Sequence, residues 1–189
     1  MLFNIHDIPS HNPTKSEDHK FGVNRFSAEQ KLFATNENLA EIIPTLQMGD
    51  MVEFFTDGKW STHHLVEELV RRIGTCKIYF STWAISEESI RVLFKLKEEG
   101  LLSEINALLE SKIPGQKDKA FGFAKEFFDE IRLTHCHAKV TILQNDHYSI
   151  VVNSSSNWTR NKRLESGVII CSHESAAFHK NWLWTQQTS

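Results

Sequence analysis

The sequence predicts an α/β protein whose mixed β-sheet carries helices on both faces. Two patterns support this prediction. Between residues 51 and 100, short apolar runs rich in β-branched and aromatic residues alternate with segments whose apolar residues recur at helical spacing. Between residues 132 and 171, strand-like segments follow one another, and a helical segment comes after them. This order is typical of a sheet that is covered by helices.

The first half of this region contains two strand–helix pairs. Ser61 and Ser86 stand where helix N-caps are expected, and Gly74 and Gly100 stand where helices end. The expected elements are a strand from Met51 to Thr56, a helix between Ser61 and Gly74, a strand from Cys76 to Trp83, and a helix between Ser86 and Gly100. Residues 1–50 show turn signals rather than periodicity, so we expect an irregular N-terminal extension in which only 27–43 fits a helix.

The second half contains most of the expected strands. Residues 101–113 fit a strand or a helix equally well. The other expected elements are an amphipathic helix at 117–131, an alternating strand at 132–143, strands at 148–152 and 166–171, and a helix at 174–184. The polar stretch 153–163 is expected to be a loop. Residues 51–189 are therefore predicted to form one domain.

Composition limits the classes of function. The formal net charge of −3 argues against indiscriminate nucleic-acid binding, although it permits a local basic site. No apolar run reaches the roughly 20 residues that cross a bilayer, and the N-terminus lacks a signal-peptide pattern, so we expect a cytoplasmic protein without membrane contact. Cys76, Cys136 and Cys171 are widely spaced, which predicts reduced, buried thiols rather than disulfides or a zinc site.

The most informative residues lie between 135 and 165. His137 and Lys139 are two residues apart on an expected strand, so their side chains are expected to share a face. A turn at 145–146 and a second strand then lead to Ser155 and Asn157. The hairpin brings an imidazole, an ammonium, a hydroxyl and a carboxamide together. Histidine can attack phosphorus or transfer a proton, and lysine and asparagine can hold phosphoryl oxygens as charge develops.

In this order and spacing the region resembles the phospholipase D superfamily, whose members carry HxK, a second strand, a GSxN-like loop and then a glutamate. Here these positions are His137, Lys139, Ser155, Asn157 and Glu165. The resemblance covers residues 51 to 185 and is strong over 137 to 165. It implies the phospholipase D-like α/β sandwich and a histidine that forms a covalent phosphohistidine, without metal or other cofactor.

The same resemblance implies a role for each residue and a partner. Glu165 would orient His137, Ser155 would help to position phosphate, and a second histidine would protonate the leaving oxygen. The sequence has a single HxK at His137, so a second copy of the chain is expected to complete the site across a two-fold axis. Two positions depart from the family pattern: Gln144 replaces its aspartate, and Ser154 replaces its loop glycine.

Several neighbouring residues carry open alternatives. Arg160, Lys162 and Arg163 fit either a grip on a polyanion or a solvated loop, and Trp158 is a candidate for contact with substrate. His135 and His137 on one face suggest a metal site only weakly, because no third ligand is evident. Other residues are expected to be structural: His63 and His64 facing solvent, Trp83 in the core, and Phe178, Trp182 and Trp184 in the core or a dimer interface.

These observations favour a cytoplasmic, homodimeric phosphodiesterase that acts on nucleic acid as a nuclease or endonuclease. Two alternatives remain open. One is a weak or inactive copy of the fold that binds nucleic acid or a protein, which the substitutions at Gln144 and Ser154 suggest. The other is a phosphodiesterase that acts on a lipid or a small molecule.

Overall fold

The computed structural model describes residues 30–35, 39–56, 58–116, 118–160 and 162–185. Its strands are, in chain order, β1 (Gln30–Thr35), β2 (Met51–Thr56), β3 (Cys76–Thr82), β4 (Leu102–Glu110), β5 (Glu130–Thr134), β6 (Val140–Gln144), β7 (Ser149–Ser154) and β8 (Glu165–Cys171). Its helices are α1 (Leu39–Ile42), α2 (Thr62–Ile73), α3 (Glu87–Glu98), α4 (Ile113–Gln116), α5 (Asp118–Phe127) and α6 (His173–Thr185). None of the described helices is long and apolar enough to cross a membrane.

All eight of these strands form one mixed sheet in the order β1-β2-β8-β7-β6-β3-β4-β5. The pairs β1/β2, β3/β4 and β4/β5 are parallel, because helices or longer segments connect them. The four pairs at the centre, from β2 through β8, β7 and β6 to β3, are antiparallel. As a result, β2 and β3 end, and β6 and β8 begin, at the same edge of the sheet.

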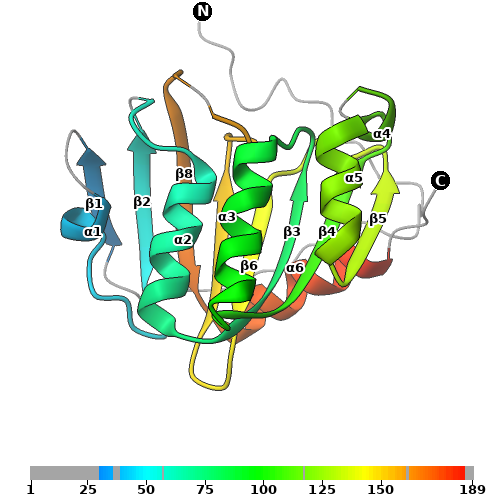
Figure 1. Ribbon diagram of the computed structural model, residues 1–189. Coiled ribbons are helices and arrows are strands. Elements are labelled where there is room, and N and C mark those ends of the chain that lie inside the picture. The colour runs from blue at the N-terminus through cyan, green and yellow to red at the C-terminus, as the bar shows by residue number, and fades with distance from the viewer. Residues whose placement is uncertain (1–29, 36–38, 57, 117, 161, 186–189) are drawn as a thin grey trace, which may run out of the picture.

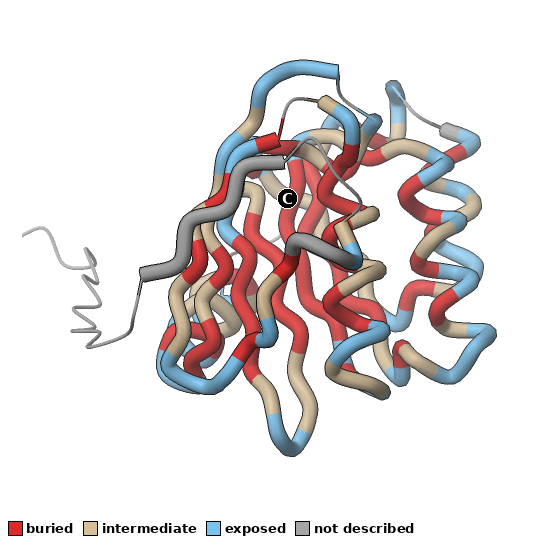
Figure 2. The backbone as a smooth tube through the Cα atoms, turned by 90° about the vertical axis from the view of Figure 1, so that its left-hand side faces the viewer, coloured by how far each residue is buried: buried red, intermediate tan, exposed pale blue. Residues whose placement is uncertain are grey.

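Helices cover both faces of the sheet, as the sequence predicts (Figure 1). α2, α3 and α5 pack on one face through the larger apolar core, in which Leu65, Leu93 and Ala124 are buried. α6 lies across the other face, where Ala176 and Leu183 complete a smaller core. Buried residues run along the central strands between the two layers (Figure 2).

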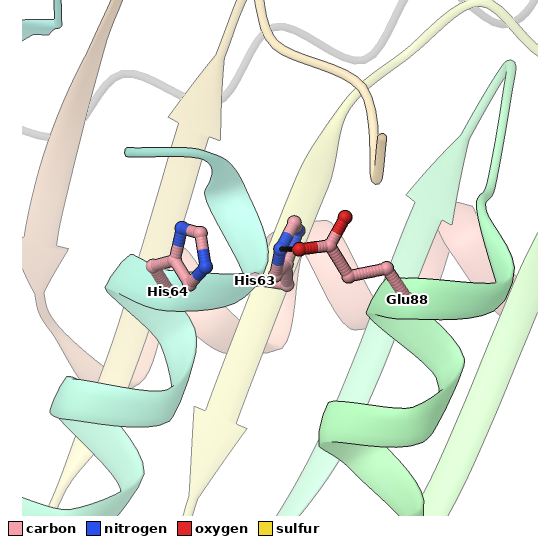
Figure 3. Close-up of side chains that lie close together, drawn as sticks. All are labelled: His63, His64 and Glu88. Atoms are coloured by element: carbon pink, nitrogen blue, oxygen red, sulfur yellow. Dashed lines mark ion pairs between the residues drawn. The ribbon is translucent and has the colours of Figure 1, made fainter. Parts of the chain in front are cut away.

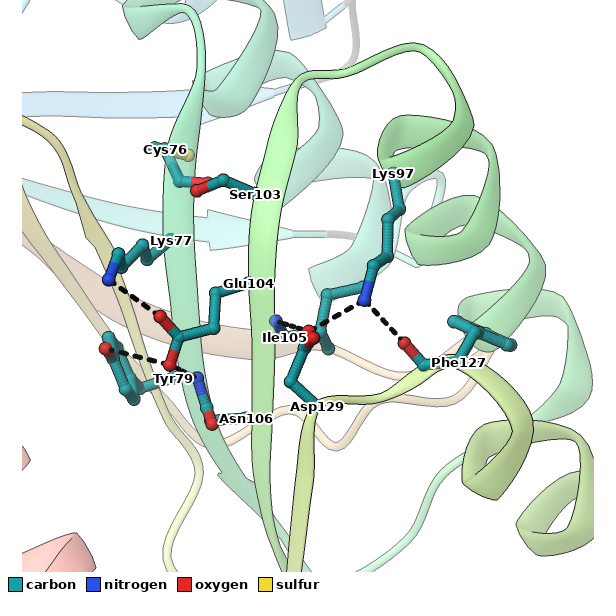
Figure 4. A network of polar contacts seen from close by, with 10 residues as sticks. All are labelled: Cys76, Lys77, Tyr79, Lys97, Ser103, Glu104, Ile105, Asn106, Phe127 and Asp129. Carbon is teal, nitrogen blue, oxygen red and sulfur yellow. Dashed lines mark hydrogen bonds and ion pairs between the residues drawn. The ribbon is translucent and has the colours of Figure 1, made fainter.

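A network of polar contacts fixes the parallel strands at the end where β3 begins (Figure 4). The Asp129 carboxylate accepts hydrogen bonds from Ile105 N and Lys97 Nζ at 2.8 and 2.7 Å. Glu104 pairs with Lys77 at 2.7 Å and accepts a hydrogen bond from Asn106 at 2.8 Å. The contacts of Asp129 and the Lys77–Glu104 pair join residues far apart in the chain, so they help to hold β3, β4 and the segment before β5 together.

Most expected elements are present, and three differ. Residues 102–110, which fit either class, form strand β4. The helix expected at 27–43 is wrong for Gln30–Thr35, which forms a strand parallel to β2. In that stretch only Leu39–Ile42 is helical. Residues 1–29 and 36–38 lie outside the described part of the chain. The continuous strand expected at 132–143 is interrupted: β5 ends at Thr134, β6 begins at Val140, and β3 and β4 lie between them in the sheet.

Candidate functional site

His137 and Lys139 lie in the irregular segment 135–139 rather than on a strand, which corrects the sequence-based expectation. This segment is held from both ends. The buried Glu110 carboxylate accepts a hydrogen bond from Cys136 N at 2.9 Å, and Val140 N donates to Ser81 Oγ at 3.2 Å. The segment therefore has a defined conformation although it forms no strand.

His137 and Lys139 are in direct contact. Lys139 Nζ lies 3.1 Å from Nδ1 and 3.5 Å from Nε2 of the His137 ring, and it donates to the His137 carbonyl oxygen at 2.6 Å. His137 is exposed, and Lys139 is half-buried. Partial burial lowers the pKa of the Lys139 ammonium, while the negative charge of the Glu165 carboxylate opposes that shift. Glu165 is thus close enough to influence the ammonium electrostatically.

The end of β7 brings Ser155 to the same place. Ser154 N donates to the Lys139 carbonyl oxygen at 3.2 Å, so the loop after β7 adjoins the segment that carries His137. Ser155 Oγ donates a short hydrogen bond to Glu165 Oε2 and accepts one from Ser166 N at 3.1 Å. These bonds place the Ser155 hydroxyl and the Glu165 carboxylate beside the His137–Lys139 pair.

Asn157 is positioned by the end of β3. The buried Thr82 hydroxyl donates to Ala84 O at 2.8 Å, lies 3.4 Å from Asn157 Oδ1, and accepts a hydrogen bond from Trp158 N at 3.2 Å. Trp158 is 1% exposed, and its ring lies 4.5 Å from that of Phe80. Trp158 therefore supports the loop from inside the core, and the expectation that it contacts substrate is wrong for this conformation.

Two exposed aromatic side chains flank the site. Trp83 is 46% exposed and its ring centroid lies 5.8 Å from that of His137, so the expectation that it is a core residue is wrong. Phe55 is 44% exposed and lines, with Ser155 and seven other residues, a groove with a volume of about 450 Å³. The site therefore has apolar, aromatic surface on two sides.

The loop 158–165 presents Arg160, Lys162 and Arg163 on the surface, where all three are exposed. Gly58 fixes how closely this loop approaches the β2–α2 connection. Its φ is +84°, and a Cβ atom there would lie 2.5 to 2.7 Å from backbone atoms of Lys162. A glycine is thus required at that point both for its backbone conformation and for space.

The two departures from the family pattern have structural explanations. Gln144 ends β6 at the hairpin, where it pairs with Ser149, roughly 16 Å along the strand from Lys139 by strand geometry. Ser154 Oγ donates to Ser166 O at 3.2 Å and accepts from Ser156 N at 3.0 Å, so the side chain that replaces a glycine helps to hold the loop.

Other histidines lie differently from their expected places. His135 is exposed and its Nδ1 lies 3.2 Å from Ser111 Oγ and 3.5 Å from Glu110 Oε1, away from the His137 ring. His63, expected to face solvent, is completely buried, and burial, followed by the nearby His64 and Arg160, lowers its pKa to about 4. The sequence does carry a signal for the burial of His63, because His63 precedes Val66 and Val70 at the spacing of a buried helix stripe.

Sequence reasoning did not identify Thr82 or Ser89 as supports of the site. Ser89 Oγ donates to the Trp158 carbonyl oxygen at 2.6 Å, and Ser86 N donates to the same oxygen at 2.8 Å. Serine and threonine are so common at strand and helix ends that no pattern in one sequence singles these two out. Phe178 is 39% exposed on α6, whereas Trp182 and Trp184 are half-buried against the smaller core.

Comparison with known proteins agrees with this architecture. No family model and no curated protein sequence matches the chain. Among solved structures it resembles NucT from Helicobacter pylori, with a TM-score of 0.53 and 13% identity over 71% of this chain and 94% of the other. It also resembles phosphatidylserine synthase from Haemophilus influenzae, with a TM-score of 0.54 and 14% identity over 74% and 39%. A third is polyphosphate kinase from Porphyromonas gingivalis, with a TM-score of 0.51 and 11% identity over 72% and 27%.

The likeness to these three structures supports the fold of this chain, a mixed sheet with helices on both faces. The chain spans nearly the whole of NucT, but well under half of the other two proteins. At this level of identity the fold alone is shown. The fold gives the candidate residues related places: His137 and Lys139 precede β6, Ser155 and Asn157 follow β7, and Glu165 begins β8, all at the same edge of the central strands.

Proposed function

We propose that this protein is a metal-independent phosphodiesterase, specifically a nuclease, that acts through a phosphohistidine at His137. The observation that carries the proposal is the contact of the exposed His137 ring with Lys139 Nζ at 3.1 Å, beside Ser155 and Glu165. A nucleophilic nitrogen and a cation at one exposed point are what attack on an anionic phosphodiester requires. Localisation in the cytoplasm remains part of the proposal.

In the proposed first step, a ring nitrogen of His137 forms a bond to phosphorus while the bond from phosphorus to the leaving oxygen breaks. Lys139 and the amide of Asn157 hold the non-bridging oxygens. The leaving oxygen takes a proton from a second acid, for which we propose the partner's His137. Water then attacks phosphorus, the phosphorus–nitrogen bond breaks, and the histidine is restored.

In this structure the Lys139 ammonium lies within 3.5 Å of both ring nitrogens of His137. A bound phosphate would compete for Lys139 and draw it from the ring. With Nδ1–H donating to Glu165 as the proposed acceptor, Nε2 would be the nucleophile. Among the described residues the ring nitrogens of His137 contact Lys139 and not Glu165, so this role of Glu165 stays a proposal.

Nucleic acid is the substrate class that the surroundings favour. Trp83 and Phe55 offer exposed aromatic faces on which bases can stack. Arg160, Lys162 and Arg163 offer positive charge to a phosphate backbone, although the chain is acidic overall. An anionic phospholipid could also contact the basic residues, so a direct assay is needed to separate the two classes.

The test is hydrolysis of single- and double-stranded DNA, RNA, phospholipid vesicles and bis(p-nitrophenyl) phosphate in EDTA, with His137→Ala and the matched control His135→Ala. His135 is a neighbouring exposed histidine that faces Ser111. We expect the His137 variant to lose at least about 1,000-fold of the activity, and the control to stay within about 3-fold. A labelled substrate should also leave phosphate on the wild-type chain that is released by acid and resists alkali.

Equal activity of the His137 variant and the wild type would refute the catalytic assignment. A folded wild-type protein that binds nucleic acid but hydrolyses none of the substrates would instead support the alternative of a binding module. In that case the substitution of His137 should weaken binding only modestly, because Lys139 and the basic loop remain.

A further inference from the structure

A second group of titratable side chains lies away from His137, between the first turns of α2 and α3 (Figure 3). His63, His64 and Glu88 each have a potential ligand atom, and these three atoms lie within 4.8 Å of one another. This is the one group of three or more metal-binding side chains found in the described part of the chain. The function proposed above does not use it.

His63 is the unusual member of this group. The side chain is completely buried, and its Nε2 has no hydrogen-bond partner among the described residues. Buried polar atoms are nearly always paired, so an unpaired one indicates that something is missing from the immediate surroundings. The side chain of Glu88 extends toward this nitrogen, with Oε1 4.0 Å from Nε2 (Figure 3).

The proton on the His63 ring can be assigned from its other contact. Ser89 Oγ lies 2.6 Å from the Trp158 carbonyl oxygen and 3.3 Å from His63 Nδ1. A carbonyl oxygen only accepts, so the serine proton points to Trp158 and Nδ1–H of His63 donates to the serine oxygen. Nε2 is then a bare lone pair.

A lone pair on Nε2 and a carboxylate oxygen therefore face each other. Two acceptors in this arrangement require a donor or a cation between them. A bridging water would hold its two partners about 4.6 Å apart, and a tetrahedral metal with bonds of about 2.0 to 2.2 Å would hold two ligand atoms about 3.4 Å apart. The observed 4.0 Å lies between these two values, and the nearby His64 ring supplies the third ligand atom that a metal ion needs.

We propose that His63, His64 and Glu88 bind one divalent transition-metal ion such as Zn²⁺. His63 would bind through Nε2 while Nδ1–H stays on Ser89, which is the outer-shell arrangement that orients metal-binding histidines in general. The 47% exposed Glu88 side chain can close the remaining few tenths of an ångström by a small rotation. Solvent would fill the fourth position.

His64 loses a hydrogen bond when it binds the ion. Its Nδ1 now accepts a hydrogen bond from Ser61 N at 3.1 Å, so its neutral ring carries the proton on Nε2. Coordination through Nε2 moves that proton to Nδ1 and gives up the bond. The positive ends of α2 and α3, together with Arg160, also oppose a cation. We therefore expect micromolar affinity rather than the tighter binding of a closed structural zinc site.

The site is linked to the loop that carries Asn157. The path runs from His63 through Ser89 to the carbonyl oxygen of Trp158, the residue after Asn157. A metal on Nε2 polarises the ring and strengthens this chain of hydrogen bonds. The ion would act on stability and on loop position, while the bond-breaking chemistry proposed at His137 stays free of metal.

The experiment is a titration of the full chain, first stripped with EDTA and dialysed, with ZnCl₂ by calorimetry and with Co²⁺ by visible absorption. Glu88→Gln removes a ligand, and Glu87→Gln is the matched control, since Glu87 is the preceding exposed residue and pairs with Arg91. His64→Gln removes the third ligand. Both Glu88 and His64 reach solvent, so these variants should fold.

We expect one ion per wild-type chain, a higher melting temperature with zinc, and a cobalt spectrum of tetrahedral intensity. Glu88→Gln and His64→Gln should bind at least about 10-fold more weakly, and Glu87→Gln should match the wild type. Equal affinities of the Glu87 and Glu88 variants, or no binding to the wild type, would overturn the proposal. Neither result depends on whether the protein hydrolyses phosphodiesters.

Discussion

At the scale of single residues, His63 makes the stability of the protein sensitive to acid. Its pKa is about 4 in the folded chain, against an ordinary value of 6.5, because burial, His64 and Arg160 disfavour the charged ring. Between these two values the unfolded chain binds the extra proton and the folded chain does not. Stability is therefore complete above pH 6.5 and declines as the pH falls toward 4.

The full shift corresponds to about 3 kcal/mol of unfolding free energy between pH 7 and pH 4. Urea denaturation across this range measures it, in EDTA so that no metal contributes. His63→Asn supplies the control, since an amide can donate to Ser89 and does not titrate. Between pH 7 and pH 4 the unfolding free energy of this variant should lack most of the change of about 3 kcal/mol expected for the wild type. A variant with the same acid lability as the wild type would assign the effect to other groups, such as the half-buried His179.

Thr82 is the second residue whose role can be tested alone. Thr82→Val keeps the shape of the side chain but leaves the buried N–H of Trp158 without its acceptor, at a cost of roughly 1 to 3 kcal/mol. It also frees Asn157 Oδ1. We expect kcat of Thr82→Val to fall about 10-fold with little change in KM. Thr82→Ser should restore both kcat and the unfolding free energy. Loss of stability without a change in kcat would make Thr82 purely structural.

The sequence suggests candidate reactive residues, but it predicts their environment poorly. The types and order of His137, Lys139 and Asn157 follow from chemistry that can be recognised in one chain. Whether a side chain is covered depends on elements distant in sequence. Trp83 is exposed because β3 ends there, and Trp158 is buried because its loop turns inward onto Phe80. Neither fact has a local signal.

At the scale of secondary-structure elements, periodicity and caps predict α2, β3 and α3 almost to the residue. Ser86 accepts the hydrogen bond from Ser89 N that its N-cap position predicts. The failures arise where tertiary contacts decide. The Cys136 backbone bonds to Glu110 instead of a strand, so 135–139 leaves the sheet. Gln30–Thr35 forms a strand because β2 offers it an edge.

The β2–α2 connection offers a test of how one element positions another. In Gly58→Ala the new methyl group meets the Lys162 backbone, so the loop with the basic residues must move. Gly49→Ala is the matched control, because Gly49 also has a positive φ, +98°, but has open space around it. Conformational strain alone should lower the unfolding free energy of each variant by about 1 kcal/mol. Gly58→Ala should cost about 1 to 3 kcal/mol more and raise KM for nucleic acid.

The two glycine variants are compared by urea denaturation and by steady-state kinetics on the best substrate. A KM that rises only in Gly58→Ala would connect the loop position to binding. Equal losses of stability in both variants, with unchanged KM, would mean that the loop yields to the methyl group without consequence for substrate.

At the scale of the whole molecule, the exposed site accounts for the proposed second copy of the chain. The His137 ring lies at the surface beside Trp83, which is 46% exposed, and Phe55 and Leu164, next to Thr56 and Glu165 where β2 ends and β8 begins, are 44% and 76% exposed. A second protomer across a two-fold axis would cover these apolar side chains and bring a second His137 to the phosphate. Each protomer alone has one histidine, one lysine and one asparagine of the set.

This arrangement predicts how mixtures of wild-type and inactive chains behave. If both His137 side chains serve one shared site, a dimer with a single His137→Ala chain is inactive. Co-refolding wild type with an equal amount of the variant then leaves about one quarter of the dimers fully wild-type by random pairing. Because the mixture holds twice as many dimers as the wild type alone would form, a fixed amount of wild type loses about half of its activity. His135→Ala in place of the variant should cause no loss. Activity that stays proportional to the wild-type chains, in a mixture shown by tag capture to contain mixed dimers, would mean that each protomer acts alone.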